Sequence, residues 1–456
     1  MTSDVPRHLH YAAIAVEAVG SALQLAAAAA LVAVVRGGTP GTAAALALLG
    51  IVISAVIAYV RWRATTYWLD DVALHYRSGV FTPDERVVPR TRVQALDTAT
   101  GPLQRIFGVV EVRVQVPGAE DEDEIVLAAV TSEEISRLRR ELGQAEPAAP
   151  DVRVTLGSRD LLLAAITSPQ ISVAVSAVAG VFAFFNEVVD LSAGESLVDR
   201  LDAPGEIALA AAIILAGGYV VSFVAGLVVF AGFEAERDAQ VLRIRRGLLA
   251  RRALSIPLQR VDGVVILEGL LRGPLGLAAL RLESVAHGSE GASGRTLLPL
   301  VRRRDAEAVI SRLIPLLAIE PGTLERPPRR ALRQFVLVPA AQWGILAAVV
   351  ALLWLPAAWP VAAPLAAIAA VLGFRSYRAA GLRLAGDVVV VRETRLARRT
   401  LIARRHRLQQ HELEQTVLQQ RARLADLSVT VGSGGRSTAQ YLESGTAQTA
   451  FERLRR

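Results

Sequence analysis

The sequence predicts a membrane protein in which α-helical transmembrane hairpins alternate with small β-rich domains, three times along the chain. Three observations predict this fold class. A stretch at residues 72–116 returns at 239–284 and again, more altered, at 387–431. Each copy follows a pair of long apolar runs. Within the copies, apolar and polar residues alternate as they do in half-buried strands. A pattern that returns at this length indicates one repeated structural unit.

Fixed shifts superimpose the copies residue by residue. A shift of 168 places Gly79 on Gly247 and Pro89 on Pro257, and a shift of 315 places Arg92 on Arg407. One arginine therefore recurs in all three copies, at Arg92, Arg260 and Arg407. A residue that recurs in different surroundings is expected to serve the common fold, although phosphate or carboxylate contact stays open as a second interpretation.

The composition supports membrane spans and restricts the available chemistry. The chain has 456 residues, of which 52% are hydrophobic and only 5% aromatic, and its mean hydropathy is +0.40. It has no cysteine, which excludes disulfides and thiolate metal sites. All 50 basic residues are arginine, for a net charge of +7. Arginine suits phosphate and lipid headgroups, but a coding bias toward arginine and alanine explains the same composition.

Paired apolar runs predict hairpins at residues 11–61, 160–232 and 334–374. A helix needs about 20 residues to cross the hydrocarbon core, and these runs qualify. Arginines flank the spans on the side of the β-rich domains, whereas the loop 186–206 carries six acids and one arginine. The distribution of arginine therefore predicts six spans in the plasma membrane, with both termini and all three domains in the cytoplasm. Pro364 leaves a re-entrant last hairpin open.

The soluble stretches at 62–145, 233–320 and 375–456 are the predicted β-rich domains. In the first, Val109–Val116 alternates cleanly, and the acidic segment Glu120–Glu124 connects it to the next strand. Thr131 begins a capping-box pattern, after which Ile135 and Leu138 share one helical face. Each domain is therefore expected to be a small antiparallel sheet closed by one C-terminal helix.

Short motifs in these domains carry a family resemblance. The first copy contains VPRTRVQ at 88–94 and PLQRIFG at 102–108, and the second contains IPLQRV at 256–261. The third keeps only Arg407–Gln409 and Leu418–Gln420 of these motifs. Together with the preceding hairpins, they resemble the bacterial membrane-anchored PH-like domain family of the YdbS/YdbT type, in its longer three-module form. The resemblance implies curved antiparallel sheets with a C-terminal helix, and an association of some members with resistance to antimicrobial peptides.

Charge selects the candidate contact residues. Residues 61–150 carry a net charge of −4, residues 233–330 carry +6, and residues 375–456 carry +9. The second and third domains therefore suit anionic lipid, and the first suits a basic protein partner. The candidates for lipid or partner contact are Arg92, Arg260, Arg398, Arg399, Arg404, Arg405 and Arg407. Glu17 and Gln342 are the candidates for a polar role inside the membrane, and for Glu17 snorkelling or helix–helix contact is the favoured interpretation over a proton-coupled role.

Two classes of function remain after the motif search. No HExxH, paired catalytic carboxylates or nucleophile elbow occurs in the sequence, so we expect no enzyme activity, metal or cofactor. The first class is a membrane scaffold that self-associates or pairs with a small PH-like membrane subunit. The second is a transporter or intramembrane enzyme with regulatory domains, which the scarcity of polar residues in the spans disfavours. We expect no nucleic-acid binding, because the third domain has few aromatic residues for base stacking.

Overall fold

The computed structural model describes residues 5–35, 39–80, 82–93, 95–116, 125–143, 150–167, 204–238, 240–284, 296–319, 322–353, 359–432 and 434–455. The chain divides into two compact units, which are described separately. Unit 1 comprises Met1–Pro150, Val154–Glu234 and Arg243–Ser255, and unit 2 comprises Asp151–Arg153, Ala235–Leu242 and Ile256–Arg456. The predicted acidic segments 120–124 and, up to residue 203, 186–206 lie outside the described residues.

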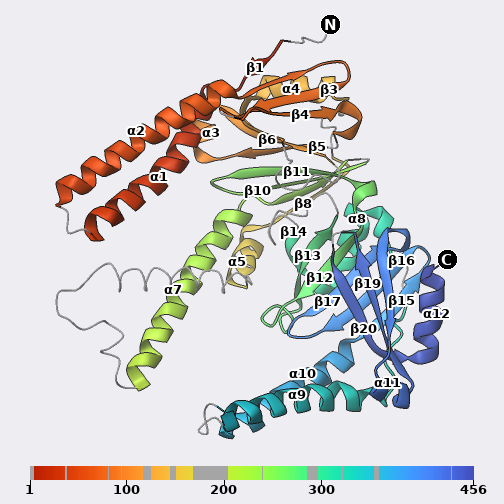
Figure 1. Cartoon of the computed structure of the whole chain (residues 1–456). Helices are drawn as coiled ribbons and strands as arrows, with labels where there is room; N and C mark the ends of the chain where they lie inside the picture. The colour runs from red at the N-terminus through yellow and green to blue at the C-terminus, as the bar shows by residue number, and fades with distance from the viewer. Residues whose placement is uncertain are drawn as a thin grey trace. The chain divides into compact units, whose positions relative to one another are not determined.

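Unit 1 begins with a helical hairpin inserted into a sheet. Strands β1 (Arg7–His8), β2 (Thr66–Leu69), β3 (Ala73–Ser78) and β4 (Asp84–Pro89) form an antiparallel sheet in that order. Helices α1 (Ala12–Val35) and α2 (Pro40–Ala64) lie side by side between β1 and β2 in the chain (Figure 1). Because β1 and β2 pair, and the indole nitrogen of Trp62 donates to the Leu9 carbonyl at 2.8 Å, both ends of the hairpin are attached to the sheet.

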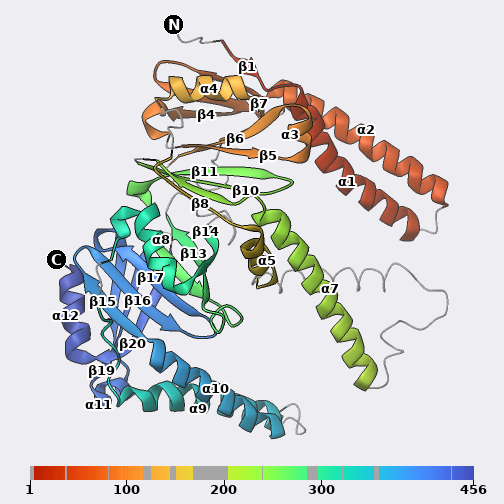
Figure 2. The same cartoon turned by 180° about the vertical axis from the view of Figure 1, so that it is seen from behind.

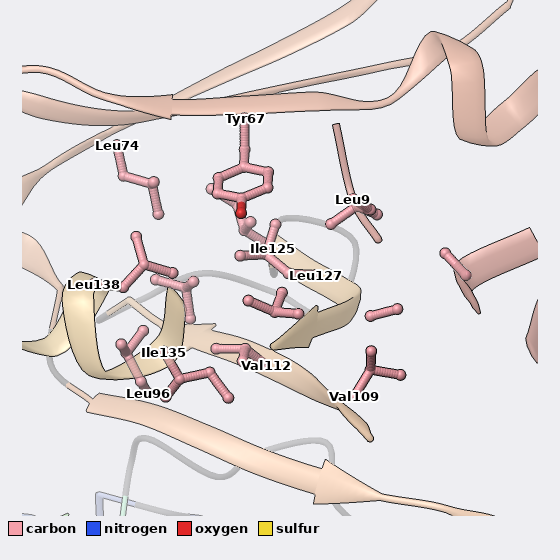
Figure 3. Packing of buried hydrophobic residues seen from close by; sticks show 14 of the residues in the cluster. Leu9, Tyr67, Leu74, Leu96, Val109, Val112, Ile125, Leu127, Ile135 and Leu138 are labelled. Atoms are coloured by element: carbon pink, nitrogen blue, oxygen red, sulfur yellow. The ribbon is translucent and has the colours of Figure 1, made fainter. Parts of the chain in front are cut away.

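A second sheet completes the first module. After the turn η1 (Arg90–Arg92) come β5 (Ala95–Thr100), α3 (Pro102–Ile106), β6 (Val109–Gln115), β7 (Ile125–Thr131) and the helix α4 (Ser132–Glu141). Figure 3 shows side chains from both sheets and from α4 meeting in one buried cluster. Ile135 and Leu138 are buried there, and the Thr131 hydroxyl accepts the Glu134 N–H, as predicted. The predicted single sheet is wrong, because the strands separate into two sheets that enclose this core.

The second module follows the same plan, and the division between the units runs through its first strands. Its elements are β8 (Val152–Thr155), α5 (Ser158–Ile166), α7 (Pro204–Phe230), β9 (Glu234–Arg237), β10 (Val241–Arg246), β11 (Arg251–Pro257), η3 (Leu258–Arg260), β12 (Gly263–Glu268), β13 (Leu277–Glu283), β14 (Thr296–Arg302), η5 (Arg303–Asp305), α8 (Ala306–Leu313) and η6 (Pro315–Leu317). The N–H of Asp151 donates to the Arg237 carbonyl at 2.8 Å, and that of Leu156 donates to the Phe233 carbonyl at 3.1 Å. Once more, a strand precedes the helices and pairs with the strand that follows them.

The third module belongs to unit 2. Its elements are α9 (Ala331–Leu353), α10 (Trp359–Ala379), β15 (Gly381–Ala385), β16 (Val388–Thr394), β17 (Arg398–Arg404), η8 (Arg405–Arg407), β18 (Leu408–Glu414), α11 (Val417–Ala422), β19 (Leu424–Val431), β20 (Arg436–Glu443) and α12 (Ser444–Arg455). Here the leading strand is reduced to a bridge between Glu325 and Leu382, which exchange two backbone hydrogen bonds. Both views show α9 beside α10 and α12 at the C-terminus (Figure 2).

The helices match the predicted hairpins only in part. Among the described residues, Ala44–Ala64 and Ala331–Val350 are long and apolar enough to cross a membrane, by length and composition. Shorter apolar helical segments are Ala12–Ala26 and Leu215–Phe230. Helices α1 and α2 form the first predicted hairpin, and α9 and α10 form the third. The second hairpin extends into residues 168–203, outside the described part of the chain.

The repeat is confirmed element by element, although its boundaries differ from those predicted. Adding 168 to the bounds of η1, β5 and β6 reproduces those of η3, β12 and β13. Adding 147, the difference between the two sequence shifts, takes β11 onto β17 and η3 onto η8. Each module, however, starts before its hairpin, with β1, β8 or the Glu325 bridge, and not after it. Elements this short carry no periodicity, so the sequence could not reveal them.

Candidate functional site

Two strand junctions join sheets of successive modules edge to edge. In unit 1, β5 pairs antiparallel with β11, and Thr100 lies opposite Arg251. In unit 2, β12 pairs antiparallel with β17, and Glu268 lies opposite Arg398. Adding 168 to position 100 and 147 to position 251 gives the second pair, so both junctions have the same register. Continuous sheets therefore connect what the sequence shows as separate domains.

Two acidic residues anchor the junction of unit 2. The Glu268 side chain is only 6% exposed, and its carboxylate accepts from Arg303 Nε at 3.0 Å and Arg398 Nη1 at 3.1 Å. Glu283 is similarly buried and pairs with Arg399 Nη2 at 3.3 Å. Arginine–carboxylate hydrogen bonds are strong when they are shielded from water. Two of the predicted contact residues, Arg398 and Arg399, thus bind carboxylates of the preceding module in the same sheet, and a lipid role for them stays a prediction.

The opposite end of the same junction gathers three arginines. The Arg404 guanidinium donates to the carbonyls of Gln259 and of Val261, the latter at 3.0 Å, and Arg407 donates to Gln259 at 2.8 Å. Burial lowers the pKa of Arg260 and of Arg404, and the positive charge of Arg407 lowers both further. Three buried nitrogens of this group, Arg260 Nη1, Arg404 Nε and Arg407 Nε, meet no acceptor among the described residues.

The fold brings Arg260, Arg404 and Arg407 together in one arginine cluster. The fixed shifts between the sequence copies could not show this meeting. Three like charges with N–H groups to spare match the requirements of a phosphate or carboxylate, and anionic lipid as that ligand stays a prediction. Arg405 follows in the same turn, where its backbone N–H donates to the Asp387 carbonyl at 2.6 Å. Arg92 belongs to unit 1, where it is exposed on η1.

The polar candidates in the helices belong to different units. Glu17 on α1 pairs with Arg61 on α2 at 2.8 Å, which ties the two helices together at one end. Gln342 is exposed on α9, in the turn that follows Pro339. These contacts support helix–helix contact as the role of Glu17, and they bring no second polar side chain to Gln342 within the described part of α9 and α10.

The described residues offer little for catalytic or metal chemistry. They contain no group of three or more His, Asp or Glu side chains that could hold a metal ion. One cleft of about 400 Å³ in unit 2 is lined by polar residues, among them Glu325, Arg383 and Arg453. Arg383 also donates to the Gly322 carbonyl at 3.2 Å, so it serves the segment that leads into α9.

The sequence analysis did not identify the buried acids that bind arginines at the junction of unit 2. Glu268 ends the apolar strand GVVILE, and its repeat equivalents are Thr100 and Gln415. A charge that interrupts an apolar strand was the available signal, because a buried carboxylate must find a partner. Its partner Arg398 lies 130 residues away, and only the strand pairing brings the two together.

Comparisons with known proteins agree with this arrangement. The bacterial PH domain family matches at residues 12–146, 174–316 and 334–456, and each match begins within one of the predicted hairpins. The UPF0699 transmembrane protein YdbT of Bacillus subtilis (strain 168) is 26% identical over 418 residues, which cover 82% of this chain and 81% of that protein. The transmembrane protein YdbS of the same organism is 29% identical over 100 residues, 22% of this chain and 60% of that protein. The chain therefore belongs to the bacterial PH domain family, with three copies of the domain.

Proposed function

We propose that this protein is a non-enzymatic integral membrane scaffold, whose three PH-like modules serve as an assembly platform at the cytoplasmic face of the bacterial plasma membrane. The observation that carries this proposal is the edge-to-edge pairing of strands at two junctions in one register. Modules that served separate ligands would need freedom to move, whereas shared sheets hold their neighbours in fixed register. Sheet continuity is what an assembly platform requires.

The helices supply the anchor in this proposal. Large apolar side chains are exposed on α2, such as Leu48 and Val52, and on α9, such as Ile345 and Leu346. Exposed apolar surface of this extent is typical of segments that face lipid. The names of the relatives YdbT and YdbS describe them as transmembrane proteins, which supports the same location for this chain. The six-span topology and protection of the cell envelope belong to this proposal.

Cysteine labelling tests the topology, because the natural chain contains no cysteine. One variant carries Val417→Cys, at an exposed position of the third module. The other carries Ser192→Cys, in the acidic loop that the sequence predicts to lie outside. In intact spheroplasts, a membrane-impermeant maleimide should label Ser192→Cys within minutes and leave Val417→Cys unlabelled until lysis. Labelling of Val417→Cys in intact spheroplasts would place the modules outside and end this proposal.

The same strains separate a scaffold from a transporter. The Gln342→Ala and Glu17→Gln variants should keep the wild-type phenotype under envelope stress, because a scaffold needs no polar path through the membrane. Loss of the phenotype in Gln342→Ala, with normal protein levels, would favour the transporter.

A further inference from the structure

Each strand of the internal junctions has a counterpart in another module that stays at the edge of its sheet. Strand β18 is the third-module equivalent of β5 and β12, and β4 is the first-module equivalent of β11 and β17. Both are terminal strands of their sheets, since the strand orders are β18-β19-β20 and β1-β2-β3-β4. Within the described part of the chain, neither has a strand on its outer side. An open edge displays backbone donors and acceptors to any complementary strand.

Charge distinguishes the two partners at an internal junction. The incoming strand begins with two arginines in both cases, Arg251 and Arg252 in β11 and Arg398 and Arg399 in β17. The receiving strand carries an acid, Asp97 in β5 or Glu268 in β12. At the unit 2 junction, Glu268 binds one arginine of its own module, Arg303, and one of the incoming strand, Arg398. At the unit 1 junction, Asp97 instead accepts from the Ser255 N–H at 2.9 Å, so there only the overall charges of the two strands are opposite.

Strand β18 also carries acids, although not at the position of Glu268, whose equivalent is Gln415. Its Glu412 and Glu414 both contact Arg436 of β20, at 2.8 and 3.0 Å. Two carboxylates share one guanidinium, which leaves one negative charge in excess on this face of the edge. In the register of the internal junctions, Glu414 would lie opposite the residue equivalent to Arg399 of an incoming strand. Leu413, which is 37% exposed, would lie opposite the equivalent of Thr400.

Strand β4 of a second copy of this chain would pair poorly with β18. In the same register, β4 of a second copy would place Asp84 opposite Glu414 and Glu85 opposite Leu413. Like charges directly opposite each other destabilise a strand pair. Arg86 already binds Asp84 at 2.8 Å, so the basic residue of β4 is engaged. Acidic residues on an outer strand are a common protection against uncontrolled edge-to-edge assembly.

We propose that β18 is a docking edge for the fourth strand of a PH-like module in another protein, one that begins with a basic pair as β11 and β17 do. The partner strand would add antiparallel to β18, with its second basic residue opposite Glu414. This inference rests on the proposed scaffold function, which it extends by naming the class of partner. Because β4 begins with two acids, a second copy of this chain does not occupy β18, and each chain takes up one partner module.

Register-specific disulfide formation with the full-length, detergent-purified chain tests the proposal. The chain carries the single substitution Leu413→Cys, and the probe is a synthetic peptide with the sequence of residues 396–407 and cysteine in place of Thr400. Residues directly opposite in a strand pair have Cβ atoms about 4.5–5.5 Å apart, close enough for a disulfide after small adjustment. We expect a covalent adduct at least tenfold above that of Val417→Cys, an exposed control outside the strand. A Thr100→Cys/Arg251→Cys double variant, which links an internal junction, confirms that the oxidation conditions report register.

Three further measurements make the test decisive. Adding Glu414→Arg to Leu413→Cys should lower the adduct at least fivefold. A peptide of residues 82–92, with cysteine in place of Glu85, should react no better than the background. The chain with both Leu413→Cys and Glu85→Cys should stay monomeric under oxidation. Adduct equal to the Val417→Cys background, equal reaction of the two peptides, or disulfide-linked ladders of the chain itself would each overturn the proposal. The labelling experiment above is independent of all three outcomes.

Discussion

The two internal junctions have the same register but different side-chain chemistry. At β5·β11, Thr98, Ala99 and Thr100 lie opposite residues 251–253, and Arg251 and Arg252 are exposed. At β12·β17, six residue pairs connect the strands, and Glu268 and Glu283 are buried with arginine partners. The comparison shows that backbone geometry sets the register in both places. Side chains then decide how strongly each junction holds.

The largest expected effect comes from reversing the buried charge of unit 2. Glu268→Arg would remove both ion pairs and bring a third cation to Arg303 and Arg398, so we expect a loss of about 3 kcal/mol of stability. The matched change in unit 1 is Thr100→Arg, at the equivalent position opposite Arg251. Because Arg251 is exposed and Thr100 only half-buried, its cost should stay below about 1 kcal/mol.

Hydrogen exchange with mass spectrometry, on the full chain in detergent, measures both effects locally. Glu268→Arg should speed exchange in β12 and β17 and leave β5 and β11 unchanged. Equal protection factors in the two variants would mean that the ion pairs of unit 2 add nothing to that junction.

A turn glycine offers a smaller change that should act on the other junction. Gly247, in the turn before β11, has a φ of +105°, and an added Cβ would collide with the carbonyl oxygen of Ala250. Gly247→Ala should therefore cost on the order of 1–3 kcal/mol and increase exchange in β11. Gly276→Ala is the control, since Gly276 also has a positive φ, +64°, but open space around the new methyl group. A cost for Gly276→Ala as large as that for Gly247→Ala would show that backbone strain alone is at work.

The smallest expected effects are changes of stability with pH, which have opposite signs in the two units. In unit 1, the backbone N–H groups of Ala73 and Val72, and then His75, lower the pKa of Asp70 to about 2. Because the folded pKa lies below the unfolded one, this carboxylate stabilises unit 1 above about pH 4, and the contribution disappears as the pH falls toward 2. In unit 2, burial raises the pKa of Asp426, so its charge costs stability at neutral pH and the cost falls in acid.

Melting curves of two asparagine variants check these opposite signs. At pH 7, Asp70→Asn should lower the Tm, and Asp426→Asn should leave it unchanged or raise it. Both differences should shrink toward pH 3. A drop in Tm for Asp426→Asn at pH 7 would mean that its hydrogen bond from the Tyr441 N–H outweighs the cost of burial.

Much of this fold was visible in local sequence patterns. Fixed shifts of 168 and 315 identify the three modules, and the Thr131 cap and the buried face of Ile135 and Leu138 follow from short-range spacing. The leading strands were not visible, because a strand of two residues or a single bridge has no period. The candidate site was predicted in part: Arg260, Arg404 and Arg407 were named, but their meeting was not.

By itself, the amino-acid sequence determined the repeat, the apolar helices and the family, because these depend on composition and on spacing along the chain. Only the tertiary structure decided that strands of successive modules share sheets, and that Glu268 meets Arg398 across 130 residues. Strand pairing depends mainly on backbone groups, which every residue carries alike, so the charges of a strand indicate its partner only once the paired strands are known. The same pairing identifies β18 as the open acidic edge, whereas in the sequence it is one more polar strand.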